Sequence, residues 1–301
     1  MSIQLGDFTS SFRHDAAGSG ATRARALQTF KALQDFGAKS CWGKTTPQNL
    51  TSKQVLGFVK HRSTQVSARS IQNEISHIRR AVRGSGRVLG DLTDPKNNWS
   101  SNRLSVPKGS RIGGKAAINI DKFNAARAEL SKPMQTVVDL QISLGLRRQE
   151  AVIAKNTGDW KMSLTVAQSQ NRGTYLQLTA DAGSKGGRAR HIYVPLGRIS
   201  STLAVVSAAH DAKIYNGHIL DYDDLKSALK GYDNALSYQE LTNNDSGHGI
   251  RRFFACQQYD YYLSTGLDKD IALSRLSQDL GHGDGRGRWV WNNYISGSRS
   301  E

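Results

Sequence analysis

Cysteine is nearly absent from this 301-residue chain, since Cys41 and Cys256 are the only two. They form no CxxC pair and no cluster with histidine, which excludes a disulfide framework and a structural zinc site. Long apolar runs are absent as well. Segments such as "STLAVVSAA" at residues 201–209 fall far short of the ~18 apolar residues that cross a bilayer, so the composition indicates a globular protein without a membrane span.

The opening segment, "MSIQLGDFTSSF", lacks the basic start and the following apolar stretch that mark a secretory signal. We therefore expect a cytoplasmic protein.

Acidic residues are the scarcer charge, because 25 Asp and Glu stand against 41 Lys and Arg, a formal net charge of +16. Residues 1–115 hold 19 basic side chains against 6 acidic ones, whereas the other 186 residues hold 22 against 19. Each phosphate that a basic side chain neutralises releases counterions, so this surplus predicts a polyanionic partner. A basic surface that serves only solubility is the alternative. No amphipathic helix with a strong apolar anchor is visible, which disfavours a membrane surface.

Apolar residues at helical spacing predict helices in the first third of the chain. One helix carries Leu27, Phe30, Leu33 and Phe36, a second begins near Thr51, and a third spans about residues 67–87. The apolar face of the third comprises Ile71, Ile75, Ile78 and Val82. Arginines lie elsewhere on that helix, and we expect the following to contact DNA: Arg69, Arg79, Arg80, Arg83.

Domain boundaries follow from composition. Residues 1–20, polar and rich in Gly and Ser, are expected to be a flexible tail, and residues 21–103 a helical domain. Residues 104–118 combine Pro, Gly and Ser with basic residues and no periodicity, which is typical of a linker. Its candidate DNA contacts are Lys108, Arg111 and Lys115. Residues 119–301 form the expected second domain.

The second domain is expected to contain helices and a few strands. We predict strands in "SLTVAQ" at residues 163–168, "TYLQLTA" at 174–180 and "ARHIYVPL" at 189–196. A glycine-rich hairpin, "DAGSKGGR", joins the last two. Helices are expected again from about Asp223 onward.

Four segments of this domain carry side chains suited to an anion. "GLRRQE" places Arg147 after the end of a helix, and an arginine fork donates two parallel hydrogen bonds to phosphate oxygens. "HGIR" places His248 and Arg251 on one helix face, near a positively polarised N-terminus. Lys185 lies at the tip of the hairpin, and "GHGDGRGRW" with "VWNNYIS" brings His282 and Tyr294. Each segment alone is also compatible with an ordinary solvated surface.

The order of these elements resembles the tyrosine recombinase (phage integrase) family over about residues 20 to 295. The resemblance implies a mainly α fold with a small antiparallel β-sheet, in the α+β class. An N-terminal helical core-binding domain of the SAM-like type and a C-terminal tyrosine-recombinase catalytic domain would form a C-shaped clamp on DNA.

Roles follow by matching motifs. Arg147 matches the family's first catalytic arginine, with Arg148 as the alternative. Lys185 matches the hairpin lysine that acts as a general acid toward the leaving 5′ oxygen. His248 and Arg251 match the His-x-x-Arg pair, in which the arginine holds the scissile phosphate and the histidine assists proton transfer.

The end of the chain supplies the last two matches. His282 matches the residue after Leu-Gly that hydrogen-bonds the phosphate, and Tyr294 matches the nucleophile. Their separation is twelve residues, whereas about nine is usual, so Tyr259, Tyr261 and Tyr262 are alternative nucleophiles. The extra residues are read as a lengthened loop.

The resemblance implies a site-specific DNA recombinase or integrase that cleaves and rejoins DNA through a 3′-phosphotyrosine, without a metal ion, another cofactor or ATP. It would act in the integration, excision or inversion of a mobile element. The expected partners are double-stranded recombination sites, a homo-tetramer on synapsed DNA with a monomer or dimer when free, and DNA-bending accessory proteins. The expected location is the bacterial cytoplasm, at the nucleoid.

Two alternatives keep the fold, namely a non-catalytic DNA-binding or architectural protein and a type IB topoisomerase. A metal-dependent nuclease is disfavoured, because the sequence shows no carboxylate cluster.

Overall fold

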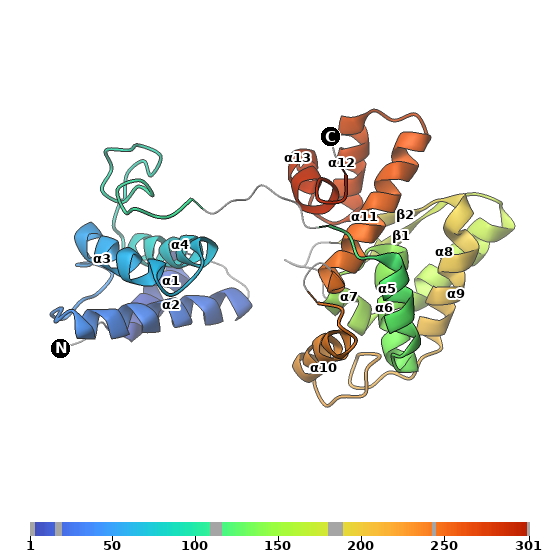
Figure 1. Ribbon diagram of the computed structural model, residues 1–301, viewed down its shortest axis with the longest axis horizontal. Coiled ribbons are helices and arrows are strands. Elements are labelled where there is room, and N and C mark those ends of the chain that lie inside the picture. Colours follow the sequence, from blue (N-terminus) through green and yellow to red (C-terminus); the bar gives the residue numbers. More distant parts are fainter. Residues whose placement is uncertain (1–3, 16–19, 109–115, 180–188, 243–244, 300–301) are drawn as a thin grey trace. The chain divides into compact units, whose positions relative to one another are not determined.

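The computed structural model describes residues 4–15, 20–108, 116–179, 189–242 and 245–299. The chain divides into two compact units, Met1–Ser110 and Arg111–Glu301 (Figure 1). Their boundary falls within residues 104–118, the segment that the sequence predicts as a linker.

The first unit is helical. Its helices in the described residues are α1 (Leu5–Asp15), α2 (Gly20–Lys39), α3 (Ser52–Ser63) and α4 (Ala68–Gly84). The predicted face of α4 is buried at Ile71, Ile75, Ile78 and Val82. Helix α3 begins after Thr51, whose side chain and that of Gln54 form a capping box that satisfies free N–H groups of the first turn.

The expected flexible tail at residues 1–20 is wrong for residues 5–15, because these form α1. Phe8 and Phe12 lie one helical turn apart and are 0% and 2% exposed. Both rings pack against Phe30 of α2, with centroids 5.5 and 5.8 Å away, and α1 packs on α4. Two aromatic side chains in a polar segment are enough to bury one face of a helix.

The second unit contains one small sheet among helices (Figure 1). The helices before the sheet are α5 (Ile120–Ala128), α6 (Lys132–Leu144), α7 (Arg148–Ile153) and α8 (Thr157–Ser169). After the sheet come η1 (Leu196–Arg198), α9 (Ile199–His210), α10 (Leu225–Tyr238), α11 (Gly247–Ser264), α12 (Lys269–Asp279), α13 (Gly287–Val290) and the π-helix η3 (Trp291–Ile295).

The sheet confirms two of the three predicted strands. Strands β1 (Thr174–Leu178) and β2 (Arg190–Val194) pair antiparallel, with Thr174 opposite Val194 and Leu178 opposite Arg190. Leu176, Leu178, Ile192 and Val194 face the core. The joining segment, residues 180–188 with the predicted hairpin tip, lies outside the described residues.

The third predicted strand, at residues 163–168, is wrong because this segment lies inside α8. The buried residues of α8 are Thr157, Trp160, Leu164 and Ala167, three, four and three positions apart, which is the helical period. Within residues 163–168 alone the apolar residues look alternating, as in a strand, because six residues are too few to show the helical repeat. Packing of α8 on α9 supports the helix.

Helix α11 is the central support of the second unit. It packs against α6 on one side and α12 on another, and its buried residues include Phe254 and Tyr259. No helix in the described parts of the chain is long and apolar enough to span a membrane.

Candidate active site

Arg147 is positioned by a sharp break between α6 and α7. Helix α6 ends at Gly145, whose φ of 60° lies in the left-handed region, and a Cβ atom there would lie 2.2 Å from the Phe254 ring. Glycine therefore permits both the turn and the close approach of α11. The chain continues through the buried Leu146, and Arg147 directly precedes α7.

Glu150 is a fully buried carboxylate that binds two arginines. It accepts hydrogen bonds from the backbone N–H and from Nη1 of Arg147, both at 2.7 Å. Arg190 of β2 donates to it through Nη1 at 2.5 Å and Nη2 at 2.7 Å. Burial alone would raise the pKa of Glu150, but the hydrogen bonds and charge of Arg190, with the charges of Arg251 and Arg147, lower it to about 2. The carboxylate is therefore ionised at neutral pH.

Arg251 is the third arginine of this group and is 1% exposed. Its Nη1 donates to the carbonyl of Gly145, and its Nη2 donates to the carbonyl of Leu280 at 2.5 Å. The Leu280 carbonyl also accepts from Arg147 Nη2 at 3.1 Å, so it links the two arginines. Burial lowers the pKa of Arg251 to about 10, which leaves the guanidinium charged at neutral pH.

Tyr294 lies in η3 and contacts two of the predicted catalytic residues. Its Oη accepts a hydrogen bond from Arg251 Nε at 3.4 Å and lies 3.2 Å from His282 Nε2. The tyrosine ring packs beside His282 and Trp289, with centroid distances of 5.6 and 5.9 Å. The side chain is 6% exposed and is therefore held in one place.

The three alternative tyrosines lie on α11 and are placed differently. The Tyr259 hydroxyl is buried, and Tyr261 donates to Tyr193 Oη at 3.5 Å. Tyr262 donates to Asp279 at 2.6 Å. These three side chains lie outside the pocket that Tyr294 lines.

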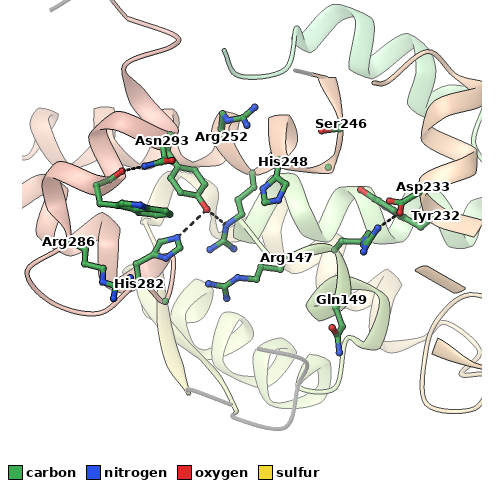
Figure 2. A pocket seen from close by; sticks show the side chains of 16 residues that line it. Arg147, Gln149, Tyr232, Asp233, Ser246, His248, Arg252, His282, Arg286 and Asn293 are labelled. Atoms are coloured by element: carbon green, nitrogen blue, oxygen red, sulfur yellow. Dashed lines mark hydrogen bonds and ion pairs between the residues drawn. The ribbon is translucent and has the colours of Figure 1, made fainter. Parts of the chain in front are cut away.

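The pocket has a volume of about 990 Å³ and is strongly basic (Figure 2). The arginines in its wall are Arg147, Arg148, Arg251, Arg252 and Arg286. Figure 2 shows Arg147, His248 and His282 converging from three different segments. The Tyr294 hydroxyl lies between His282 Nε2 and Arg251 Nε. Such a site favours an anion, because several guanidinium groups supply both charge and planar donors.

Two histidines line the same pocket. His248 lies in the first turn of α11, and surrounding protein together with the charges of Arg252 and Arg251 lowers its pKa. His282 follows α12, and burial together with the charges of Arg251 and Arg147 lowers its pKa to about 3. Both imidazoles are therefore neutral at pH 7 in the free protein.

We expect acid to destabilise the protein partly through His282. The ordinary histidine pKa is ~6.5, so between pH 6.5 and 3 the unfolded chain binds a proton that the folded chain does not. The free energy of unfolding therefore falls as the pH drops through this window. Urea denaturation at pH 7 and pH 5 should show a smaller loss for His282→Asn than for the wild type. His191→Asn, an exposed position on β2, is the control, and equal losses in all three proteins would contradict this assignment.

Five of the six predicted catalytic residues line this one pocket: Arg147, His248, Arg251, His282 and Tyr294. Lys185 lies outside the described residues. The alternative arginine, Arg148, forms an exposed ion pair with Asp233, whereas Arg147 lies within the buried arginine group. The geometry thus favours Arg147 over Arg148.

Two of the predicted DNA contacts on α4 have partners inside the first unit. Arg79 is half-buried and donates through Nη2 to the carbonyl of Trp99 at 2.5 Å and to Ser101 Oγ at 3.3 Å. Arg80 lies over the Phe12 ring at 5.1 Å. The helical spacing of apolar residues in α4 could not reveal that Arg79 binds the segment around Trp99 and Ser101.

The other predicted DNA contacts are placed differently. Arg69, Arg83 and Lys108 are exposed. Arg111 and Lys115 lie outside the described residues.

Arg190 and Arg286 were missed as members of the site. Arg190 had a signal in the sequence, because it occupies the same face of β2 as the buried Ile192 and Val194, and an arginine facing a core needs an anionic partner. Arg286 lies in the "GHGDGRGR" segment, whose sequence indicates only a lengthened loop.

The described residues contain no group of three or more His, Cys, Asp or Glu side chains that could hold a metal ion.

A model of the integrase family matches residues 105–257 of this chain. This range includes Arg147, His248 and Arg251 and ends before His282 and Tyr294. No curated protein sequence matches the chain.

Solved structures with a similar fold include two of the Tn1549 transposon integrase. The complex with transposon right-end DNA is 13% identical, with 99% of this chain and 95% of that chain covered and a TM-score of 0.56. A complex with a circular intermediate DNA is also 13% identical, covering 98% and 95%, with a TM-score of 0.57. The XerH site-specific recombinase bound to difH substrate, a pre-cleavage complex, is 13% identical and covers 93% and 76%, with a TM-score of 0.51. At this identity the likeness concerns the fold.

Proposed function

This chain belongs to the integrase family, the tyrosine recombinases, and from that premise we propose that it is a site-specific DNA recombinase acting through a 3′-phosphotyrosine. The observation that carries the proposal is the position of the Tyr294 hydroxyl. It lies between Arg251 Nε and His282 Nε2 at the wall of a pocket rich in arginine.

The scissile phosphate is expected to bind between Arg147 and Arg251. A guanidinium has five N–H donors. Hydrogen bonds from the side chains use three donors on Arg251 and two on Arg147, so donors remain for the non-bridging oxygens. Glu150 and the Leu280 carbonyl hold both side chains before DNA arrives, which avoids a reorganisation cost during the reaction.

In the proposed cleavage step, Tyr294 Oη attacks phosphorus and the bond from phosphorus to the 5′ oxygen breaks. The hydroxyl accepts a hydrogen bond from Arg251 Nε and lies 3.2 Å from His282 Nε2. By their match to the family, His248 takes up the tyrosyl proton and His282 hydrogen-bonds the phosphate. Lys185, by its match to the family, supplies a proton to the leaving 5′ oxygen. The two arginines stabilise the added negative charge on the phosphorane.

Rejoining reverses these events with the 5′ hydroxyl of another strand. That hydroxyl attacks the phosphotyrosine, the bond between phosphorus and Oη breaks, and the proton returns to Tyr294. Because the ester conserves the energy of the original bond, the proposed exchange needs no ATP, and Arg147 and Arg251 supply the positive charge that a metal ion would otherwise supply. We propose that four copies act on two synapsed DNA sites during integration, excision or inversion of a mobile element.

The exposed cations of the first unit are proposed to bind the DNA backbone. Arg69→Gln and Arg83→Gln should each weaken DNA affinity and lower the slope of log K against log salt by about one, without changing thermal stability. Arg79→Gln is the contrasting variant, because it removes a donor from the Trp99 carbonyl and should cost about 1–2 kcal/mol of unfolding free energy. Equal behaviour of the three variants in both measurements would contradict the assignment.

Covalent trapping tests the proposal. Labelled, nicked duplexes from the ends of the genetic element that encodes this chain are incubated with the wild-type protein in EDTA and separated in SDS. We expect label on the protein, mapped by mass spectrometry to the peptide that contains Tyr294. Binding of the duplex without an adduct would indicate a non-catalytic DNA-binding protein instead of a recombinase. Relaxation of a supercoiled plasmid that lacks these sites would indicate a topoisomerase.

A further inference from the structure

The loop between α12 and α13 is held in a defined shape. Gly281, Gly283 and Gly285 have φ values of 66°, 81° and 72°, in the left-handed region that glycine adopts without strain. The Asp284 carboxylate accepts hydrogen bonds from Ser274 Oγ at 3.1 Å and from the Gly285 N–H at 2.9 Å. The loop is thus fixed to α12 on one side and leads to the tyrosine segment on the other.

Arg286 follows this loop and lines the pocket. Its side chain is exposed, and no carboxylate in the described parts of the chain lies within ion-pair distance of it. In Figure 2 Arg286 lies beside His282, whereas Asp233 lies on the far side of the drawn site. Burial and the charges of Arg251 and Arg147 are the main causes of the low His282 pKa, and the charge of Arg286 adds to them.

The pocket is therefore asymmetric in charge. On the side of α10, Arg148 is neutralised by an ion pair with Asp233. On the side of His282 and Tyr294, Arg286 brings a positive charge that has no such partner among the described residues.

A bound DNA strand extends beyond the phosphate that Arg147 and Arg251 hold. Each strand carries one charge per ~3.4 Å of helix axis, so neighbouring phosphates lie on both sides of the scissile one. We propose that Arg286 binds the neighbouring phosphate of the cut strand and so forms a second phosphate subsite beside Tyr294. This inference rests on the proposed function, because it takes DNA as the anion in the pocket.

Arg286 is then a positioning residue for the strand. An arginine can donate two parallel hydrogen bonds to one phosphate, which fixes the direction of the backbone as well as its distance. The additional residues between His282 and Tyr294 would thereby have a function, because they include Arg286.

Methylphosphonate linkages test the subsite, because each removes the charge of one phosphate. A duplex selected by binding from a random pool is prepared as a series, with one neutral linkage at each position of one strand in turn. Binding is measured for wild type, Arg286→Gln and the matched control Arg288→Gln, an exposed arginine two residues later that does not line the pocket. We expect one position at which the neutral linkage weakens wild type and Arg288→Gln about 10-fold but leaves Arg286→Gln unchanged.

The cleavage rate gives the second readout. At saturating protein, adduct formation on a nicked duplex should be about 10-fold slower for Arg286→Gln than for Arg288→Gln. Saturation removes differences in affinity, so a charge that only attracts DNA from a distance would leave this rate unchanged. Identical linkage profiles for the two variants would overturn the subsite. Absence of an adduct from the wild type would instead overturn the proposed function, and the binding profile would still decide whether Arg286 contacts a phosphate.

Discussion

Tyr294→Phe is expected to abolish the covalent protein–DNA adduct while DNA binding stays within about two- to three-fold of wild type. The variant removes one oxygen atom, which is the proposed nucleophile. The phenylalanine ring has no atom that can attack phosphorus. The other tyrosine that lines the pocket, Tyr232, is 1% exposed, and its hydroxyl donates to Gln141.

The variant should fold normally. The ring of Tyr294 remains beside His282 and Trp289, where its packing does not need the hydroxyl. The hydrogen bonds lost are long, at 3.4 Å from Arg251 and 3.2 Å from His282, so the unfolding free energy should change by less than about 1 kcal/mol. Unchanged thermal unfolding and DNA binding would therefore show that the variant loses the adduct because it lacks the nucleophile, and not because it is unfolded or unbound.

Tyr259→Phe is the matched control. The Tyr259 hydroxyl is buried without a hydrogen-bond partner among the described residues, and it lies outside the pocket. Its removal should leave both adduct formation and folding intact. An adduct that persists in Tyr294→Phe and disappears in Tyr259→Phe, Tyr261→Phe or Tyr262→Phe would reassign the nucleophile.

Glu150→Gln is expected to lower the unfolding free energy by about 3–5 kcal/mol, because it removes the counter-charge of buried arginines. Glu150 is 0% exposed and accepts two hydrogen bonds each from Arg147 and Arg190, and Arg251 Nη1 lies 3.9 Å away. For a unit of this size the melting temperature should fall by roughly 10 °C. Glu129→Gln, an exposed acid of the same unit, should change it little.

Glu150→Gln should also slow adduct formation by about 10²-fold or more, measured at a temperature where the variant is still folded. The reason is that Arg147 loses the partner that fixes it for the phosphate. A double variant, Glu150→Gln with Arg190→Gln, separates the two effects. Removing both partners should restore part of the stability lost in Glu150→Gln, whereas the rate should stay low.

The contribution of Glu150 to the unfolding free energy depends on pH in a defined direction. Glu150 has a folded pKa of about 2, below its ordinary value of 4.5, so its contribution is complete above pH 4.5 and is lost as the pH falls toward 2. The stability difference between wild type and Glu150→Gln should be constant from pH 5 to 7. A difference that already shrinks between pH 7 and 5 would contradict the ionised, arginine-bound carboxylate.

The sequence by itself determined the features that depend on local patterns. The i, i+3 and i, i+4 spacing of Ile71, Ile75, Ile78 and Val82 identified a helix and its buried face, because one face of a helix repeats every 3.6 residues. Strands β1 and β2 and the end of α6 before Arg147 were also predicted from local sequence, the strands from apolar segments bounded by turn residues and the helix end from the segment "GLRRQE". The order of arginine, histidine and tyrosine along the chain likewise identified the family.

Tertiary structure alone decided which of these side chains are buried and which groups they contact. Gly145 and Arg251 are 106 residues apart and Glu150 and Arg190 are 40 apart, so no local pattern relates them. The same holds for α1, where Phe8 and Phe12 become core residues only because α2 and α4 supply the opposing surface. Local periodicity follows from backbone geometry within a few residues, whereas burial, pKa and hydrogen-bond partners depend on atoms that only the folded chain brings together.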